Sequence, residues 1–324
     1  MTTSSLPVQN LIRSITRLQR SNTPLHIVTI CKNTEKYISL FALTHSQDYF
    51  YILPHSSWNS IIEKRPPNVH TLNRLSPPID YIICYDRAEQ YDEAVVISQT
   101  LQIPIIIVDV CSKEMIRPQH LLEQMNNDVD LERLNRTAAL YVANSKYIQE
   151  SWDSNMNGIS LEIPFGIDIE KFKTQDVSRS GIALDNNTAP QVGNLIAIHL
   201  NNTHAIIPTD HDGDDITVNT TKYFINTYKN ITIKTLEAMA AENVVICLNT
   251  SDISAHIEHK VTGWLLNDLH DLPIALDELE QNNELRIAIG QQARQKIIAK
   301  HSLETFQSEW TNAFHMVKSA IYHP

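Results

Sequence analysis

The residues best suited to chemistry lie in one short segment, TIKTLEAMAAENVVI (232–246). A helix-forming run, TLEAMAAEN, precedes the apolar strand-like run VVICL, and Glu237 is expected at the very start of the helix. The first N–H groups of a helix favour negative charge, so this position suits a phosphate or a carboxylate. On these residues alone, two interpretations stay open: Glu237 complements the helix dipole, or it holds a ligand.

A second candidate is Asp109, near the end of the apolar run IPIIIVDV (103–110). In open α/β sheets, ligands bind in the crevice outside the carboxyl ends of the strands. Asp109 is therefore the best candidate for a polar role in the first half of the chain. A capping or turn aspartate is the alternative.

Other kinds of site have weaker signals. The acidic stretch TDHDGDD (209–215) lacks the ligand spacing of an EF-hand and is interpreted as a solvated turn. The fourteen histidines form no HExxH motif, and the chain has no GxSxG, P-loop or GxGxxG sequence. We therefore expect no bound metal or cofactor.

Composition restricts the class of protein. A chain of 324 residues is long enough for two domains, and its net charge of −11 is unlike that of a protein whose main task is to bind nucleic-acid phosphates. No apolar run approaches the length of a membrane-spanning helix, and the first residues lack the layout of a secretion signal. The four cysteines are far apart and favour reduced thiols, so a cytoplasmic location is expected.

The first half of the chain alternates between strand and helix patterns. Strands are expected at 25–31, 48–53, 79–85 and 103–110, helices at 34–44 and 89–102, and a helix end running into a strand at 136–145. Near-continuous apolar strands that alternate with helices predict a parallel sheet covered on both faces. This pattern indicates a Rossmann-like domain.

The second half repeats the theme. Strands are expected at 192–200, 223–228 and 244–248, helices at 235–243, 271–281, 283–302 and 302–321, and a polar linker with a loop at 174–190. The predicted fold class is α/β, with Rossmann-like domains at 1–165 and 166–324 that face a cleft. Helices close the C-terminus, and the last one could pack back on the first domain.

The N-terminal segment LIRSITRLQR (11–20) predicts an amphipathic helix. One face carries Leu11, Ile12, Ile15 and Leu18, and the other carries Arg13, Arg17 and Arg20. This helix could make a weak peripheral contact with anionic lipid, or it could pack on its own domain. With only three basic residues, packing on the domain is favoured.

Three segments carry a family resemblance, and they occur in the expected order. These are VANSKYIQESW (142–152) with IPFGIDIEKF (163–172), the segment 232–268 that contains LEAMA and HKVTGWLL, and ELRIAIGQQARQKIIAKHSLETF (284–306). Together they resemble retaining glycosyltransferases of the GT-B fold, within the family 4-like group that includes sucrose synthase-like and mannosyltransferase enzymes. The likeness covers most of residues 79–310.

The resemblance implies a hexosyl-type transferase that takes a sugar from a UDP- or GDP-linked donor and needs no metal. The first domain would be the acceptor side and the second the donor side. Glu237 would accept hydrogen bonds from the ribose hydroxyls, and Ile233, Lys234 and Thr235 would line the diphosphate cradle. Gly166, in the interdomain link, and His199, near a family lysine position, would complete the nucleotide-binding set.

Three departures from the family pattern affect the expected chemistry. Lys229 stands where the family has a glutamate that faces the donor sugar, Asn194 stands where it has an arginine, and Asp109 follows the strand where it often has a histidine. Lys229 and Asp109 are therefore the candidate catalytic residues. Lys229 could bind an anionic donor sugar or phosphate, or it could mark lost activity.

Three functions follow as hypotheses. The first is an active glycosyltransferase that acts on a glycan, a protein or another acceptor. The second is a catalytically impaired GT-B-like accessory or recognition subunit of a partner transferase. The third is a phage-type enzyme that glycosylates DNA bases, against which the acidic net charge weighs.

Overall fold

The structure is a computed structural model. It describes residues 23–30, 35–54, 56, 58, 60, 64–73, 78–85, 91–109, 138–153, 159–172, 179–184, 190–200, 206–208 and 215–322. The amphipathic segment 11–20 and most of the acidic stretch 209–215 lie outside these residues. Within the described part, no helix is both long enough and apolar enough to cross a membrane.

The chain divides into two compact units, which are described separately. The first contains residues 1–164 together with 306–324, and the second contains residues 165–305. The C-terminal helix α13 (Leu303–Tyr322) therefore belongs almost entirely to the first unit, although it ends the chain. The chain passes from one unit to the other twice, after residues 164 and 305.

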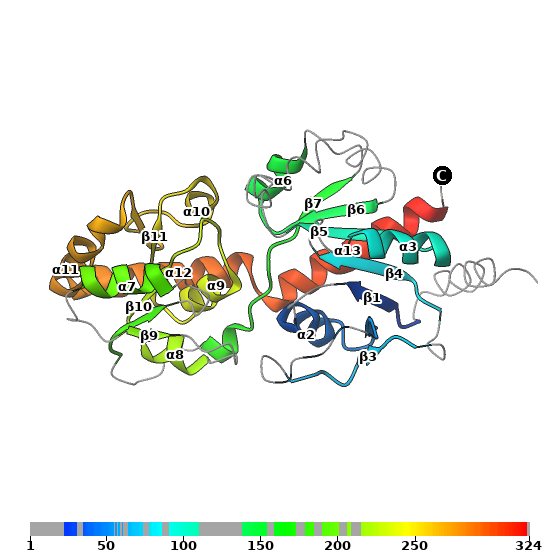
Figure 1. Ribbon diagram of the computed structural model, residues 1–324, viewed down its shortest axis with the longest axis horizontal. Helices are drawn as coiled ribbons and strands as arrows, with labels where there is room; N and C mark the ends of the chain where they lie inside the picture. The colour runs from blue at the N-terminus through cyan, green and yellow to red at the C-terminus, as the bar shows by residue number, and fades with distance from the viewer. Residues whose placement is uncertain are drawn as a thin grey trace, which may run out of the picture. The chain divides into compact units, whose positions relative to one another are not determined.

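The first unit is built on a seven-stranded parallel sheet with the order β3-β2-β1-β4-β5-β6-β7 (Figure 1). Its strands are β1 (His26–Ile30), β2 (Tyr49–Ile52), β3 (Val69–Thr71), β4 (Tyr81–Tyr85), β5 (Ile105–Asp109), β6 (Ala138–Ala143) and β7 (Ser160–Glu162). The helices between them are α2 (Glu35–Thr44), α3 (Tyr91–Leu101) and α6 (Lys146–Asp153). Because the inner strands are buried on both faces, they appear in the sequence as continuous apolar runs.

Alternate residues of the strands pack into two separate hydrophobic cores, one on each face of the sheet. On one face, Phe41 of α2 and Trp310 of α13 pack on strand residues such as Ile83. On the other face, α3 packs through Ala94 and Val95. The side-chain period of two in a strand sends neighbouring residues to opposite faces, which explains why one sheet supports both cores.

The second unit is built on a five-stranded parallel sheet with the order β12-β11-β10-β8-β9 (Figure 1). Its strands are β8 (Ile182–Leu184), β9 (Ile206–Pro208), β10 (Tyr223–Asn226), β11 (Val244–Leu248) and β12 (Trp264–Leu266). The chain first moves from β8 to β9 on one side and then returns to place β10 on the other side. Strand order therefore reverses between β8 and β10, as in doubly wound sheets.

Helices cover both faces of this sheet. One core contains α7 (Pro190–His199), α11 (Leu272–Gln281) and α12 (Asn283–Lys300), which contribute Ile196, Leu276 and Ile289 respectively. The remaining elements are η1 (Ile169–Phe172), α8 (Asp215–Thr220), α9 (Ile233–Ala240), α10 (Ser251–His256) and η2 (Leu269–Asp271). Helix α9 contacts β10, β11 and α12, so it is fixed from several sides.

Two sequence expectations were wrong in the second unit. The segment 192–200 forms most of helix α7 rather than a strand, because its apolar stretch LIAI (195–198) is short enough to fit either element by periodicity. The segment 174–190, expected as a linker, contains β8, which lies beside β10 in the sheet. Its apolar run, Ile182–Leu184, is too short to stand out between polar neighbours.

Candidate functional site

The reversal of strand order in the second unit marks a place for a ligand. In open α/β sheets, ligands bind outside the carboxyl ends of the strands at this switch point. Here it lies between β8 and β10. The loop 227–232 leaves the carboxyl end of β10 and leads directly into α9, so it occupies this point.

Helix α9 begins with a side-chain cap. The Thr232 hydroxyl accepts a hydrogen bond from the Thr235 N–H at 3.1 Å, and the two threonine hydroxyls lie 2.9 Å apart. Thr235 is fully buried, and its N–H is used within the cap. The N–H groups of Ile233 and Lys234 come first in the helix, where the dipole favours an anion.

Glu237 is the fifth residue of α9 and therefore does not lie at the very start of the helix, where the sequence placed it. The dipole effect falls off within the first turn, and that turn contains no acidic residue, so a role as dipole complement is weakened. The Glu237 carboxylate lies 2.8 Å from the ammonium group of Lys234, and both side chains are largely buried. The structure thus brings two of the predicted nucleotide-binding residues together as an ion pair.

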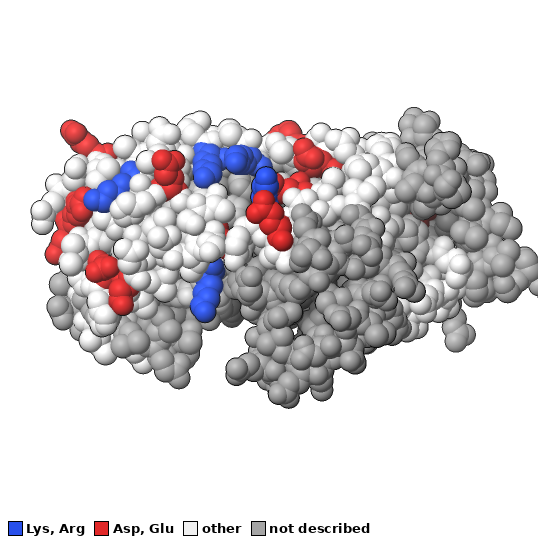
Figure 2. All heavy atoms as spheres, turned by 90° about the horizontal axis from the view of Figure 1, so that it is seen from above, with Lys and Arg blue, Asp and Glu red and all other residues white. Residues whose placement is uncertain are grey.

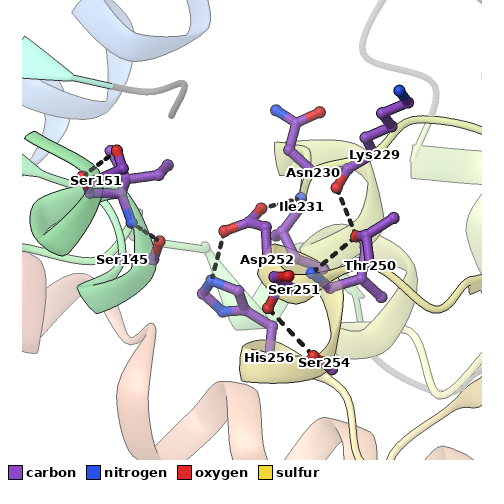
Figure 3. Close-up of polar contacts among 12 residues, drawn as sticks. Ser145, Ser151, Lys229, Asn230, Ile231, Thr250, Ser251, Asp252, Ser254 and His256 are labelled. Carbon is purple, nitrogen blue, oxygen red and sulfur yellow. Dashed lines mark hydrogen bonds and ion pairs between the residues drawn. The ribbon is translucent and has the colours of Figure 1, made fainter. Parts of the chain in front are cut away.

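Lys229 lies in the loop, and its side chain is exposed. Its backbone carbonyl accepts a 2.7 Å hydrogen bond from the Thr250 hydroxyl, while its side chain extends away from α10 (Figure 3). The Lys229 ammonium group is therefore exposed near the carboxyl end of β10, while its backbone is held by the bond from Thr250.

Two buried side chains hold this loop, and sequence reasoning missed both. Asn226 donates to the Asn230 carbonyl at 3.0 Å and accepts from the Tyr228 N–H at 2.8 Å. Asp252 accepts from the Ile231 N–H at 2.9 Å (Figure 3). The available signals were an asparagine that directly follows an apolar strand and the helix-start sequence TSD (250–252).

Two histidines lie near each other in this unit: His256 is the last residue of α10, and His301 contacts the residues on both sides of Gly166. The His301 Nδ1 lies 2.9 Å from the Phe165 carbonyl, and the Ile167 N–H donates to the His301 carbonyl, so Gly166 is flanked by two bonds to one histidine. Burial lowers the pKa of His301 to about 4. Burial, helped by Lys296 and Lys300, also lowers the pKa of His256 to about 4. Both imidazoles are therefore neutral at pH 7.

The other predicted residues are placed elsewhere. Asp109 is the last residue of β5 in the first unit and is fully buried, next to Asn144 at the end of the neighbouring strand. His199 is the last residue of α7, and Asn194 is exposed within the same helix. Among the described residues, no group of three or more His, Cys, Asp or Glu side chains is arranged to hold a metal ion.

A family comparison identifies the region that carries the loop and α9. Residues 196–310 match the family described as glycosyl transferase-like. The matched range contains Lys229, Lys234 and Glu237, as well as the loop-holding residues Asn226 and Asp252. No curated protein matches the chain.

Solved glycosyltransferases share the fold across both units. HepE from Anabaena, crystallised with UDP and glucose, superposes with a TM-score of 0.69 at 14% identity, covering 90% of this chain and 99% of HepE. Sucrose-phosphate synthase from Thermosynechococcus elongatus has a TM-score of 0.68 at 12% identity, covering 91% and 100% of the two chains. The chain therefore has the GT-B fold.

Proposed function

We propose that this chain is a glycosyltransferase that takes a sugar from a uridine or guanosine diphosphate donor. The observation that carries the proposal is the position of the loop 227–232 and α9. They lie at the strand-order reversal of the second unit's sheet and within the residues that match the glycosyl transferase-like family. The HepE crystals with UDP-glucose support a uridine nucleotide as the first ligand to test.

Each residue of this region then has a role that its chemistry suits. The Ile233 and Lys234 N–H groups would face the diphosphate, where the helix dipole favours negative charge. The two oxygens of Glu237 suit the two hydroxyls of a ribose. Lys229 would supply positive charge to the leaving phosphate or to an anionic donor sugar. Such catalysis consists mainly of positioning and electrostatic stabilisation.

Finer features of the reaction rest on the family resemblance. We propose a hexosyl donor and retention of anomeric configuration. The acceptor would be held by the first unit, where Asp109 is the candidate polar residue. Proton NMR of the first-formed product would distinguish retention from inversion.

Calorimetry with UDP and GDP tests the nucleotide site directly. Wild-type protein should bind at least one of them, and Glu237→Ala should weaken that binding roughly ten- to a hundredfold, as expected for lost bonds to a charged group. Glu278→Ala is a matched control, because Glu278 also pairs with a lysine, Lys260, on other elements of this unit. If neither nucleotide bound the wild type, the proposal would be wrong.

A catalytically impaired accessory subunit is the second candidate. It is favoured by the Lys234–Glu237 pair, in which one of the two lysines near the proposed diphosphate site is already neutralised. Turnover of a UDP- or GDP-sugar by the isolated chain decides between the candidates. Nucleotide binding without turnover, together with purification in complex with an active transferase, would favour the accessory role.

DNA-base glycosylation is the least supported alternative. The net charge is −11, and on the face in Figure 2 the described Lys and Arg side chains are mixed with Asp and Glu rather than forming a broad basic stripe. Proteins that bind nucleic-acid phosphates usually present such a stripe. Failure to bind a DNA column at low salt would exclude this function.

A further inference from the structure

The loop 227–232 contains no helix or strand, so its conformation depends on side-chain contacts. Loops of this kind are usually more mobile than the elements that they connect. Here, four backbone groups of the loop bind side chains: Tyr228 N–H, Lys229 C=O, Asn230 C=O and Ile231 N–H. The contacts come from Asn226, at the end of β10 itself, and from the N-terminal end of α10.

The contacts from α10 come from residues distant in sequence. Thr250 caps α10 by accepting from the Ile253 N–H, and the same hydroxyl donates to the Lys229 carbonyl. Asp252, in the first turn of α10, accepts from the Ile231 N–H. One helix start therefore fixes the loop on both sides of Asn230 (Figure 3).

Asp252 is unusual among these groups because it is a carboxylate that is almost fully buried, with 4% of its surface exposed. Burying a charge is costly unless it is hydrogen-bonded. Its position in the first turn of α10 stabilises the negative charge, and the bond from Ile231 is charge-assisted and hence stronger than a neutral one. The His256 Nε2 lies 4.0 Å from the other carboxylate oxygen.

We propose that Asp252 is a positioning residue for the diphosphate half of the nucleotide site. Through the Ile231 N–H, it fixes the loop so that Lys229 and the first N–H groups of α9 face the phosphates together. This role rests on the proposed function, because it assigns Asp252 to the same nucleotide site. Asp252 does not itself touch the ligand.

The role makes a prediction that general destabilisation does not. Asp252→Ala should weaken UDP binding about tenfold but change uridine binding less than twofold, since uridine lacks the phosphates that the loop would face. Glu237→Ala should weaken both ligands, because its proposed partner is the ribose. Asp252→Asn keeps an oxygen that can accept from Ile231, so it should restore most of the UDP affinity.

The chain provides a matched control for the carboxylate. Asp268 also accepts a backbone N–H, from His270, and also lies 4.0 Å from a histidine, but it is exposed and caps η2. Asp268→Ala should bind UDP like the wild type. Thr250→Val and Thr250→Ser form a second pair, in which only the serine keeps the hydroxyl that bonds to Lys229.

Hydrogen exchange separates the positioning role from the nucleotide function. In the nucleotide-free protein, the Ile231 amide should exchange at least tenfold faster in Asp252→Ala than in the wild type or in Asp268→Ala. If Asp252→Ala left the exchange of the Ile231 amide unchanged, or weakened UDP and uridine equally, the positioning role would be wrong. The proposed nucleotide site would still stand, because it depends on binding by the wild type. Absence of UDP binding by the wild type would overturn the proposed uridine site and, with it, this role, whatever the exchange shows.

Discussion

The two ends of helix α9 are held by different kinds of contact. At its C-terminal end, the helix packs closely on α12, and the half-buried side chain of Arg294 donates to the Ala240 carbonyl. At its N-terminal end, the helix follows a loop that is held through side-chain hydrogen bonds from Thr250, Asp252 and Asn226. The difference suggests that the C-terminal end supplies stability, whereas the N-terminal end keeps polar backbone groups in place for a ligand.

The C-terminal end has the geometry of a Schellman motif. The Glu242 N–H donates to the Met239 carbonyl, the Asn243 N–H donates to the Ala238 carbonyl, and Glu242 has a φ of 61°. The Glu242 backbone then lies directly against Gly290 of α12. Only a glycine at position 290 allows this approach.

Replacing Arg294 should give the largest effect and would test the C-terminal end. Its Nη1 donates to the carbonyls of Phe172 and Ala240, so Arg294→Met leaves two partly buried acceptors without their partner. We expect a loss of about 3 kcal/mol in the free energy of unfolding, measured by urea denaturation. Arg286→Met lies on the same helix, and the partner of its guanidinium among the described residues is the nearby Asn283, so it should lose less than about 0.5 kcal/mol.

Gly290→Ala should have the next largest effect. A β-carbon at this position would lie 2.4 Å from the Glu242 carbonyl oxygen, so α9 and α12 must move apart. The expected cost is about 2 kcal/mol in unfolding free energy. Gly193→Ala is the control, since its β-carbon would make only an ordinary 3.8 Å contact and should raise stability by roughly 0.5–1 kcal/mol. Equal effects in the two helices would contradict the close packing at position 290.

Low pH should reduce the free energy of unfolding through His256 of α10, the helix that holds the loop before the N-terminal end of α9. Burial lowers the pKa of His256 to about 4, below its ordinary value of 6.5, so the unfolded chain binds a proton that the folded chain excludes between these values. Above pH 6.5, His256 is neutral in both states and the free energy of unfolding is not reduced. As the pH falls from 6.5 towards 4, His256 is protonated in the unfolded chain alone, and the free energy of unfolding decreases. Between pH 7 and 5 the loss is about 2 kcal/mol.

Denaturation at pH 7, 6 and 5 measures this loss. His256→Gln removes the titrating group, so its stability should fall by about 2 kcal/mol less than that of the wild type over this range. His270→Gln, which alters an exposed histidine on η2, should retain the wild-type pH dependence. Identical curves for all three proteins would show that His256 is not excluded from protonation in the folded state.

The smallest effect is expected at the cap of α9. Thr232→Ala removes the hydroxyl that accepts from the Thr235 N–H, at a cost of about 1 kcal/mol. Thr232→Ser keeps this bond and should stay close to the wild type. If Thr232→Ala reduced the free energy of unfolding as much as Arg294→Met, the two ends of α9 would not differ in their contribution to stability.

Sequence reasoning was most successful where periodicity was long and unambiguous. Strands β1, β4, β5, β10 and β11 and helices α11, α12 and α13 lie at the predicted places. It failed for β8 and α7, where short apolar runs do not distinguish strand from helix. The residues around Glu237 were recognised by their motif, but Asn226 and Asp252 belong to no such motif, because each matters only through the loop that it reaches.

The sequence by itself determined that the chain is α/β, that its strands are buried on both faces, and that Glu237 belongs to a helix preceding an apolar strand. These features depend on the spacing of apolar residues along short segments, which can be seen in the sequence directly. Only the tertiary structure decided which side chains meet. It brought Asp252 to the Ile231 amide and placed Gly290 against the Glu242 backbone, whereas the Lys234–Glu237 pair is local, three positions apart on one helix. Asp252 and Gly290 find their partners 21 and 48 positions away, and those distances close only when the sheet and its helices pack together.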